Sequence, residues 1–137
     1  MKLVISTKTL MILYTNGFND PYSHIVKITL AEKCLNFEEQ LVKKNMEVLK
    51  NLNPYCYTPI LIDRALILYK TEIITEYIDE RFPHPPLLPI NPILKAKTKL
   101  LIYRINKDWF KTLSYILNLK YNISENLEKY KRNLILQ

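Results

Sequence analysis

The chain has 137 residues, of which 48% are hydrophobic, and this content excludes an intrinsically disordered protein. Its single glycine excludes the glycine-rich loops that bind nucleotide phosphates, and no uncharged apolar run approaches the roughly 20 residues of a membrane helix. The net charge of +7 lies in the second part, because residues 1–83 carry ten basic and ten acidic side chains whereas residues 84–137 carry ten and three. A basic half favours an acidic partner such as nucleic acid, although the AT-biased, lysine-rich composition explains it more simply.

The start of the chain has too short an apolar stretch for a signal peptide, so we expect a cytoplasmic protein. Cys34 and Cys56 are isolated in the sequence, and the two histidines lie far apart. These spacings match no familiar metal site and no CxxC pair. We therefore expect no metal, no cofactor and two free, partly buried thiols.

The first 81 residues alternate between signals for strand and helix. A short apolar run predicts a buried first strand, and Asp20 before Pro21 predicts a capped helix with proline in its first turn. The predicted elements are, in chain order, strand 9–14, helix 21–34, strand 36–43, helix 45–53, strand 59–62, strand 65–69 and helix 70–81. This order, βαβαββα, predicts a thioredoxin-like α/β domain over residues 1–82.

The spacing of apolar residues also predicts which faces of two of these helices are buried. The expected buried residues are Ile25, Ile28, Thr29 and Ala31 or Glu32 in the first helix, and Ile73, Ile74, Tyr77 and Ile78 in the last.

The stretch ERFPHPPLLP, residues 80–89, holds four of the eight prolines in the chain. Because proline fixes φ and removes a backbone donor, this stretch cannot be helix or central strand. We expect a stiff segment close to polyproline II that keeps His84 in one place. Such a segment suits a linker, residues 83–92, and equally a surface that another protein recognises.

Apolar residues at steps of three, four and seven predict a long amphipathic helix over residues 93–119. Ser124 is expected to cap a last helix, whose shared face comprises Leu127, Tyr130 and Leu134. These two helices make residues 93–137 a partial all-helical domain. They cannot enclose the apolar stripe of the long helix, so a partner is expected to cover it.

A thioredoxin-like domain, a proline-rich linker and a long helix form the layout of the glutathione S-transferase fold. Within that fold the sequence resembles the stringent starvation protein A family, from residue 9 to about residue 120. The resemblance is carried by YSHIVKITLAEK, LNPYCYTPILIDR, YRINKDWF and, most specifically, EYIDERFPHPPLLP. Because family members are longer, the expected fold is a thioredoxin-like N-terminal domain followed by a truncated all-α glutathione S-transferase C-terminal domain.

The resemblance implies a homodimeric transcription regulator of the starvation and stress response, without catalysis, that binds RNA polymerase holoenzyme, including its sigma subunit. The residues that it implies for this contact are Pro83, His84, Pro85 and Pro86, with Arg64 as a weaker neighbour. Asn91 departs from the family, which has an aromatic residue at this place. The basic second half leaves open a weak, nonspecific contact with promoter DNA.

A glutathione-dependent thiol transferase or glutathione S-transferase is the alternative function, and the residues argue against it. In place of a cysteine activated by the helix N-terminus the chain has Asp20, which can cap a helix but cannot exchange thiols. A hydroxyl of Tyr14 or Thr15 is the remaining candidate to hold a glutathione thiolate.

Two further parts of a glutathione cleft leave recognisable remnants in the sequence. Thr58 and Pro59 match the cis-proline turn that the whole thioredoxin-like fold shares. Lys70 and Thr71 stand where the glutamyl end of glutathione normally meets Glu-Ser, so a lysine would repel its ammonium group. Thr71 is expected to cap the helix that follows.

Overall fold

The computed structural model describes residues 10–17, 20–42, 46–113, 115–116, 119–120 and 122–124. By its contacts the chain divides into two units, Met1–Leu88 and Pro89–Gln137. The predicted linker therefore begins inside the first unit, since residues 83–88 belong to it.

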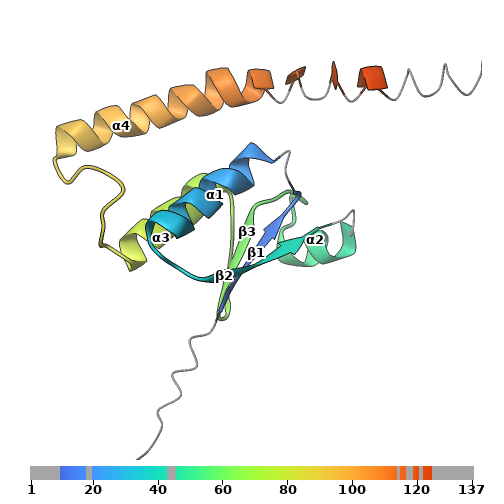
Figure 1. Cartoon of the computed structure of the whole chain (residues 1–137), viewed down its shortest axis with the longest axis horizontal. Coiled ribbons are helices and arrows are strands. Elements are labelled where there is room, and N and C mark those ends of the chain that lie inside the picture. Colours follow the sequence, from blue (N-terminus) through green and yellow to red (C-terminus); the bar gives the residue numbers. More distant parts are fainter. Residues whose placement is uncertain are drawn as a thin grey trace, which may run out of the picture. The chain divides into compact units, whose positions relative to one another are not determined.

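The first unit contains a four-stranded mixed sheet and three helices (Figure 1). Its elements are β1 Met11–Thr15, α1 Pro21–Glu32, β2 Phe37–Leu41, α2 Met46–Leu52, β3 Ile60–Asp63, β4 Leu66–Tyr69 and α3 Thr71–Arg81. The sheet order is β2-β1-β3-β4, with β1 parallel to β2 and antiparallel to β3, and with β3 antiparallel to β4. The predicted βαβαββα order and thioredoxin-like fold are confirmed.

The sheet has a core on each face, because neighbouring residues of a strand point to opposite sides and the central strands β1 and β3 are largely buried. Leu13 and Leu61 lie in the larger core, which α1 and α3 cover, whereas Tyr14 and Ile60 belong to the smaller core beside α2. Figure 1 shows α1 and α3 side by side, with α2 across the sheet from them.

The buried faces of the two larger helices differ in part from the predicted ones. In α1 the buried apolar residues are Val26 and Leu30, whereas Ile28 is 61% exposed. In α3 Ile74 and Ile78 are buried as predicted, but Ile73 is 48% exposed. Thr29 in α1 is buried as predicted. Each helix carries apolar residues on more than one face, and packing against the sheet decided which face is buried.

The second unit starts with one long helical stretch. Helix α4 spans Pro92–Arg104 and leads into a π-helical turn, η1, at Ile105–Phe110, after which the described residues of 111–124 are again helical. The predicted long helix is thus confirmed over the described residues, with a start one residue earlier. The predicted last helix beyond Ser124 lies outside the described residues.

Asn91 explains where α4 begins. Its Oδ1 accepts hydrogen bonds from the backbone amides of Ile93 at 3.0 Å and Leu94 at 3.2 Å, and Pro92 occupies the first turn. An asparagine in this place is a strong helix cap, so the residue that departs from the family pattern has a structural role.

Neither α4 nor η1, whose residues are all described, buries any side chain within the structure. Trp109 is 69% exposed, and leucines and isoleucines along the helix are exposed with it. Over the part of the chain that the structure describes, no helix combines the length and the apolar character needed to cross a membrane.

Both cysteines are free, as predicted. Cys34 is nevertheless exposed rather than partly buried, because it lies with a positive φ in the turn that follows α1. Cys56 is partly buried.

Candidate functional site

The segment that follows α3 is here called the strap, residues 83–88. Its backbone bends at several residues, and the peptide bond between His84 and Pro85 is cis, so the expected straight polyproline II segment is wrong. The side chains of Pro83, His84, Pro85 and Pro86 are all exposed. The strap is therefore a bent, solvent-facing loop, and hydrogen bonds attach its backbone to the rest of the first unit.

A buried ion pair makes this attachment. Lys33, just after the end of α1, has a fully buried side chain, and its Nζ lies 2.6 Å from Oδ1 of Asp79 on α3. The same ammonium donates to the backbone carbonyl of Phe82 at 2.6 Å and to that of Pro85. The three donors of the lysine thus meet three acceptors, and two of these flank His84 along the chain.

Asp79 holds the far end of the strap. Its Oδ1 also accepts a hydrogen bond from the backbone amide of Leu87 at 3.0 Å. Burial would raise the pKa of Asp79, but the hydrogen bonds from Lys33 and Leu87 outweigh burial and hold that pKa below its ordinary value. The carboxylate is consequently charged at neutral pH.

Arg64, the weaker candidate, lies in the exposed turn between β3 and β4 with a φ of 59°. Its neighbour Asp63 is buried and accepts hydrogen bonds from Tyr77 at 2.7 Å and from Arg81. Arg81 ends α3 just before the strap. Asp63 therefore ties the turn that contains Arg64 to the helix from which the strap departs.

The residues that the family resemblance assigns to a ligand cleft, here called the remnant cleft, lie at the starts of α1, β3 and α3. The Thr58–Pro59 bond is cis, as expected for this fold, and Pro59 is fully buried. Asn53, also fully buried, shapes the loop before this turn by donating to the carbonyl of Tyr57 and accepting from the amide of Tyr55, both at 2.9 Å.

Asp20 occupies the place of the missing cysteine, and its carboxylate is fully engaged. Oδ1 accepts the backbone amides of Tyr22 and Ser23 at 3.1 Å, which confirms the predicted helix cap. Oδ2 accepts the hydroxyl of Ser23 and, at 2.6 Å, the hydroxyl of Thr58. The donors that could receive a thiolate at this helix start are thus used by a carboxylate of the chain itself.

The two alternative hydroxyls are also committed to other roles. Thr15 is fully buried and donates to Oε1 of Glu39 at 2.7 Å. Tyr14 packs against the smaller core beside α2. Tyr14 is therefore a partly buried core residue.

At the third part of the cleft, Lys70 and Thr71 begin α3. Lys70 is exposed, has a φ of 76° and takes the cap position without a side-chain hydrogen bond to the helix. Thr71 is buried and is the first helical residue, so the expectation that Thr71 caps this helix is wrong. The positive charge of Lys70 meets the positive end of the helix dipole, where an acidic group would be favoured.

No pattern in the sequence indicated Lys33, Asp79 or Asn53 as parts of a site. Lys33 and Asp79 are ordinary charged residues at the polar margins of two helices, and no local pattern pairs them.

A cluster of three tyrosines was also not predicted from the sequence. The ring centroid of Tyr55 lies 6.2 Å from that of Tyr57 and 6.0 Å from that of Tyr69. Burial, and then the neighbouring tyrosines, raise the pKa of Tyr57.

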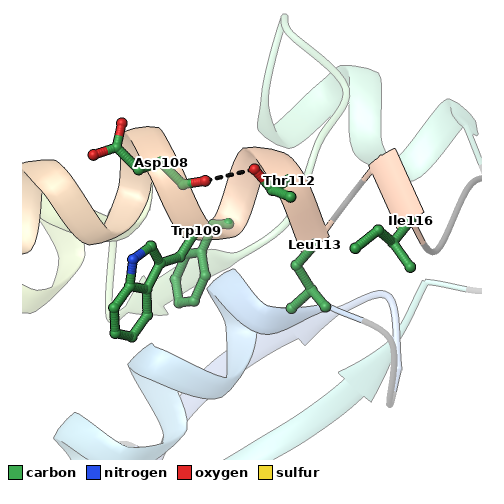
Figure 2. Close-up of a pocket in the computed structure, with 6 residues that line it drawn as sticks. Asp108, Trp109, Thr112, Leu113 and Ile116 are labelled. Atoms are coloured by element: carbon green, nitrogen blue, oxygen red, sulfur yellow. Dashed lines mark hydrogen bonds between the residues drawn. The ribbon is translucent and has the colours of Figure 1, made fainter.

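The second unit contributes a separate apolar surface. Figure 2 shows a hollow along the helix lined by Asp108, Trp109, Phe110, Thr112, Leu113 and Ile116. The hydroxyl of Thr112 donates to the backbone carbonyl of Asp108 at 2.6 Å, so this hydroxyl is satisfied within the helix. The surface offers mainly apolar contact.

The fold and the remnant cleft define the class of protein. Residues 21–81 match the family model described as glutathione S-transferase, N-terminal domain. A solved tau-class glutathione S-transferase from mango, Mangifera indica, is 25% identical, with a TM-score of 0.72 over 81% of this chain and 52% of the mango chain. This protein has the glutathione S-transferase fold.

Two bacterial relatives narrow the assignment. The stringent starvation protein A homolog of Haemophilus influenzae is 46% identical over 116 residues, 83% of this chain and 54% of the relative. That of Haemophilus ducreyi is 42% identical over 118 residues, 85% of this chain and 55% of the relative. The chain belongs to the stringent starvation protein A family and spans about half the length of these relatives.

Proposed function

We propose that this protein is a transcription regulator of the starvation and stress response that binds RNA polymerase holoenzyme through the strap and catalyses no reaction. The observation that carries the proposal concerns His84, whose side chain is exposed. The backbone carbonyls of Phe82 and Pro85, on either side of His84 in the chain, both accept hydrogen bonds from the buried ammonium of Lys33. A surface that is already ordered loses little conformational entropy when a partner binds, so it recognises that partner efficiently. The protein acts in the cytoplasm, where the polymerase works.

The state of the remnant cleft supports a role without catalysis. Asp20 fills the position of the reactive group, and Lys70 places a positive charge where glutathione carries its ammonium. Both residues disfavour the binding of glutathione. Asp20 occupies the hydrogen-bond donors that a thiolate would need, and Lys70 repels the ammonium group. The retained cis-proline turn is a feature of the fold and does not by itself indicate an enzyme.

Capture of holoenzyme by the purified protein tests the proposal. Wild-type protein is expected to retain holoenzyme with its sigma subunit, and His84→Ala is expected to weaken this retention about tenfold or more, as for a central contact residue. Lys50→Ala is the matched control, since Lys50 is exposed on α2 across the sheet from α1 and α3. Equal retention by His84→Ala and wild type would contradict the assignment of the strap as the contact surface.

The proposal includes a homodimer that uses the exposed apolar face of the second unit. Leu101 on α4 and Trp109 on η1 are both more than half exposed, and apolar surface of this kind is normally covered by a partner. Leu101→Glu is expected to shift the protein from dimer to monomer in sedimentation velocity, whereas Lys99→Glu on the same helix leaves the dimer intact. A monomeric wild-type protein would contradict the dimer.

A further inference from the structure

Both ends of the strap are attached through one charged pair. Nζ of Lys33 donates to the carbonyl of Phe82 and to the carbonyl of Pro85, so it binds the backbone on both sides of His84. Asp79, the partner of Lys33, accepts the amide of Leu87 at 3.0 Å. Two side chains from two helices therefore fix three backbone groups of one surface loop.

We infer that Lys33 is a positioning residue for His84: its buried ammonium, paired with Asp79, sets where the strap presents this imidazole to a protein partner. The consequence for binding rests on the function proposed above, whereas the effect on the strap does not. Because Lys33 follows α1 and Asp79 lies on α3, the packing of these two helices determines the place of His84.

The chemistry of the pair indicates that the ammonium group, rather than the aliphatic stem of Lys33, does this. A lysine ammonium has three donors, and here all three are matched by acceptors at a site where the lysine side chain is 0% exposed and that of Asp79 is 19% exposed. Charge-assisted hydrogen bonds of this kind are about twice as strong as neutral ones. Removing the ammonium leaves a partly buried carboxylate without its cation and two carbonyls without this donor, so the strap is released toward water.

The direct test measures hydrogen exchange at the amide of Leu87 in the full chain. Lys33→Met keeps the stem and removes the charge, and it is expected to speed exchange at Leu87 about tenfold or more, because this amide reports local opening of the strap. Amides of Leu13 and Leu61 in the sheet should speed up by no more than the loss of global stability measured by urea unfolding accounts for. Lys27→Met is the control, since it removes another α1 lysine with a carboxylate partner, Glu39, from a partly exposed position.

A second substitution at residue 33, which restores the positive charge, distinguishes a role of the lysine charge from a role of the side chain in packing. Lys33→Arg restores the charge and several donors, and it is expected to return the exchange rate at Leu87 to within about threefold of wild type. If Lys33→Met does not fold, Asp79→Asn provides the same measurement with a milder change. Unchanged exchange at Leu87 in whichever of these two variants folds would overturn the inference.

Binding then tests whether Lys33 acts through His84. Lys33→Met should weaken capture of holoenzyme about tenfold, yet add little in a His84→Ala background, since residues that act through one contact are not additive. Additive losses would contradict the positioning of His84. If wild-type protein captures no holoenzyme, the proposed function fails, and the exchange rates at Leu87 decide alone whether Lys33 positions the strap.

Discussion

The hydroxyl of Thr58 donates a hydrogen bond of 2.6 Å to Oδ2 of Asp20, two residues separated by 38 positions in the chain. This bond joins the cis-proline turn to the start of α1. The two segments are therefore tied to each other by a side-chain hydrogen bond. Asp20 serves as a helix cap and as the acceptor of this bond at once.

Asp20→Ala is expected to lower the free energy of unfolding by about 1 to 2 kcal/mol, because α1 loses its cap and Thr58 loses its acceptor. Urea unfolding followed by circular dichroism measures this change. Asp20→Asn keeps an oxygen acceptor and should lose less than half as much. A loss of equal size in both variants would contradict the role of the carboxylate oxygens as acceptors.

Wild-type protein should show no retention on immobilised glutathione. Lys70→Glu replaces the repulsive charge with an attractive one at the start of α3, so it is expected to raise the affinity for glutathione about tenfold or more, as titration calorimetry would measure. Lys50→Glu, which makes the same charge change on α2, should have no effect. Tight binding of glutathione by wild-type protein would contradict the proposal that the cleft is disabled.

The stability of the protein should depend on acid through Asp79. Its folded-state pKa is lowered from the ordinary value of an aspartate, about 3.9 in an unfolded chain. The pair with Lys33 therefore stabilises the fold fully above that value, and the contribution is lost as the pH falls through the folded-state pKa. Asp79→Asn is expected to lower the free energy of unfolding by about 1 to 2 kcal/mol at pH 6.

This difference between wild type and Asp79→Asn should shrink as the pH falls below the unfolded-state pKa and through the lowered folded-state pKa, where the wild-type carboxyl becomes protonated as well. Because the other carboxylates titrate in both proteins, the difference isolates Asp79. Urea unfolding at a series of pH values measures it. A difference that stays constant with pH would show that Asp79 has the same pKa in the folded and unfolded chain.

Asn91→Ala is expected to fray the first turn of α4, because the amides of Ile93 and Leu94 lose their acceptor. The expected cost is about 1 kcal/mol of local helix stability. Hydrogen exchange at the amides of the first α4 turn measures it, with Asn91→Asp as the control that keeps the cap and adds a favourable charge. Equal exchange in wild type and Asn91→Ala would contradict a capping role.

Much of the fold could be predicted from local patterns. The alternation of strand and helix signals, the Asp20-Pro21 cap and the turn at Pro59 are set by neighbouring residues, and the structure reproduces them. The strap was also found from its prolines, since proline excludes helix and sheet wherever it occurs. Its shape was not found, because the bends depend on what its backbone contacts.

Local chemistry alone thus determined the order of the elements, the carboxylate of Asp20 at the start of α1 and the positive charge of Lys70 at the start of α3. Only the tertiary structure decided that Lys33 and Asp79 meet beneath His84, and which stripe of α1 faces the core. The physical reason is that burial and pairing belong to surfaces from distant parts of the chain. A lysine has no preferred partner until the packing of two helices removes it from water.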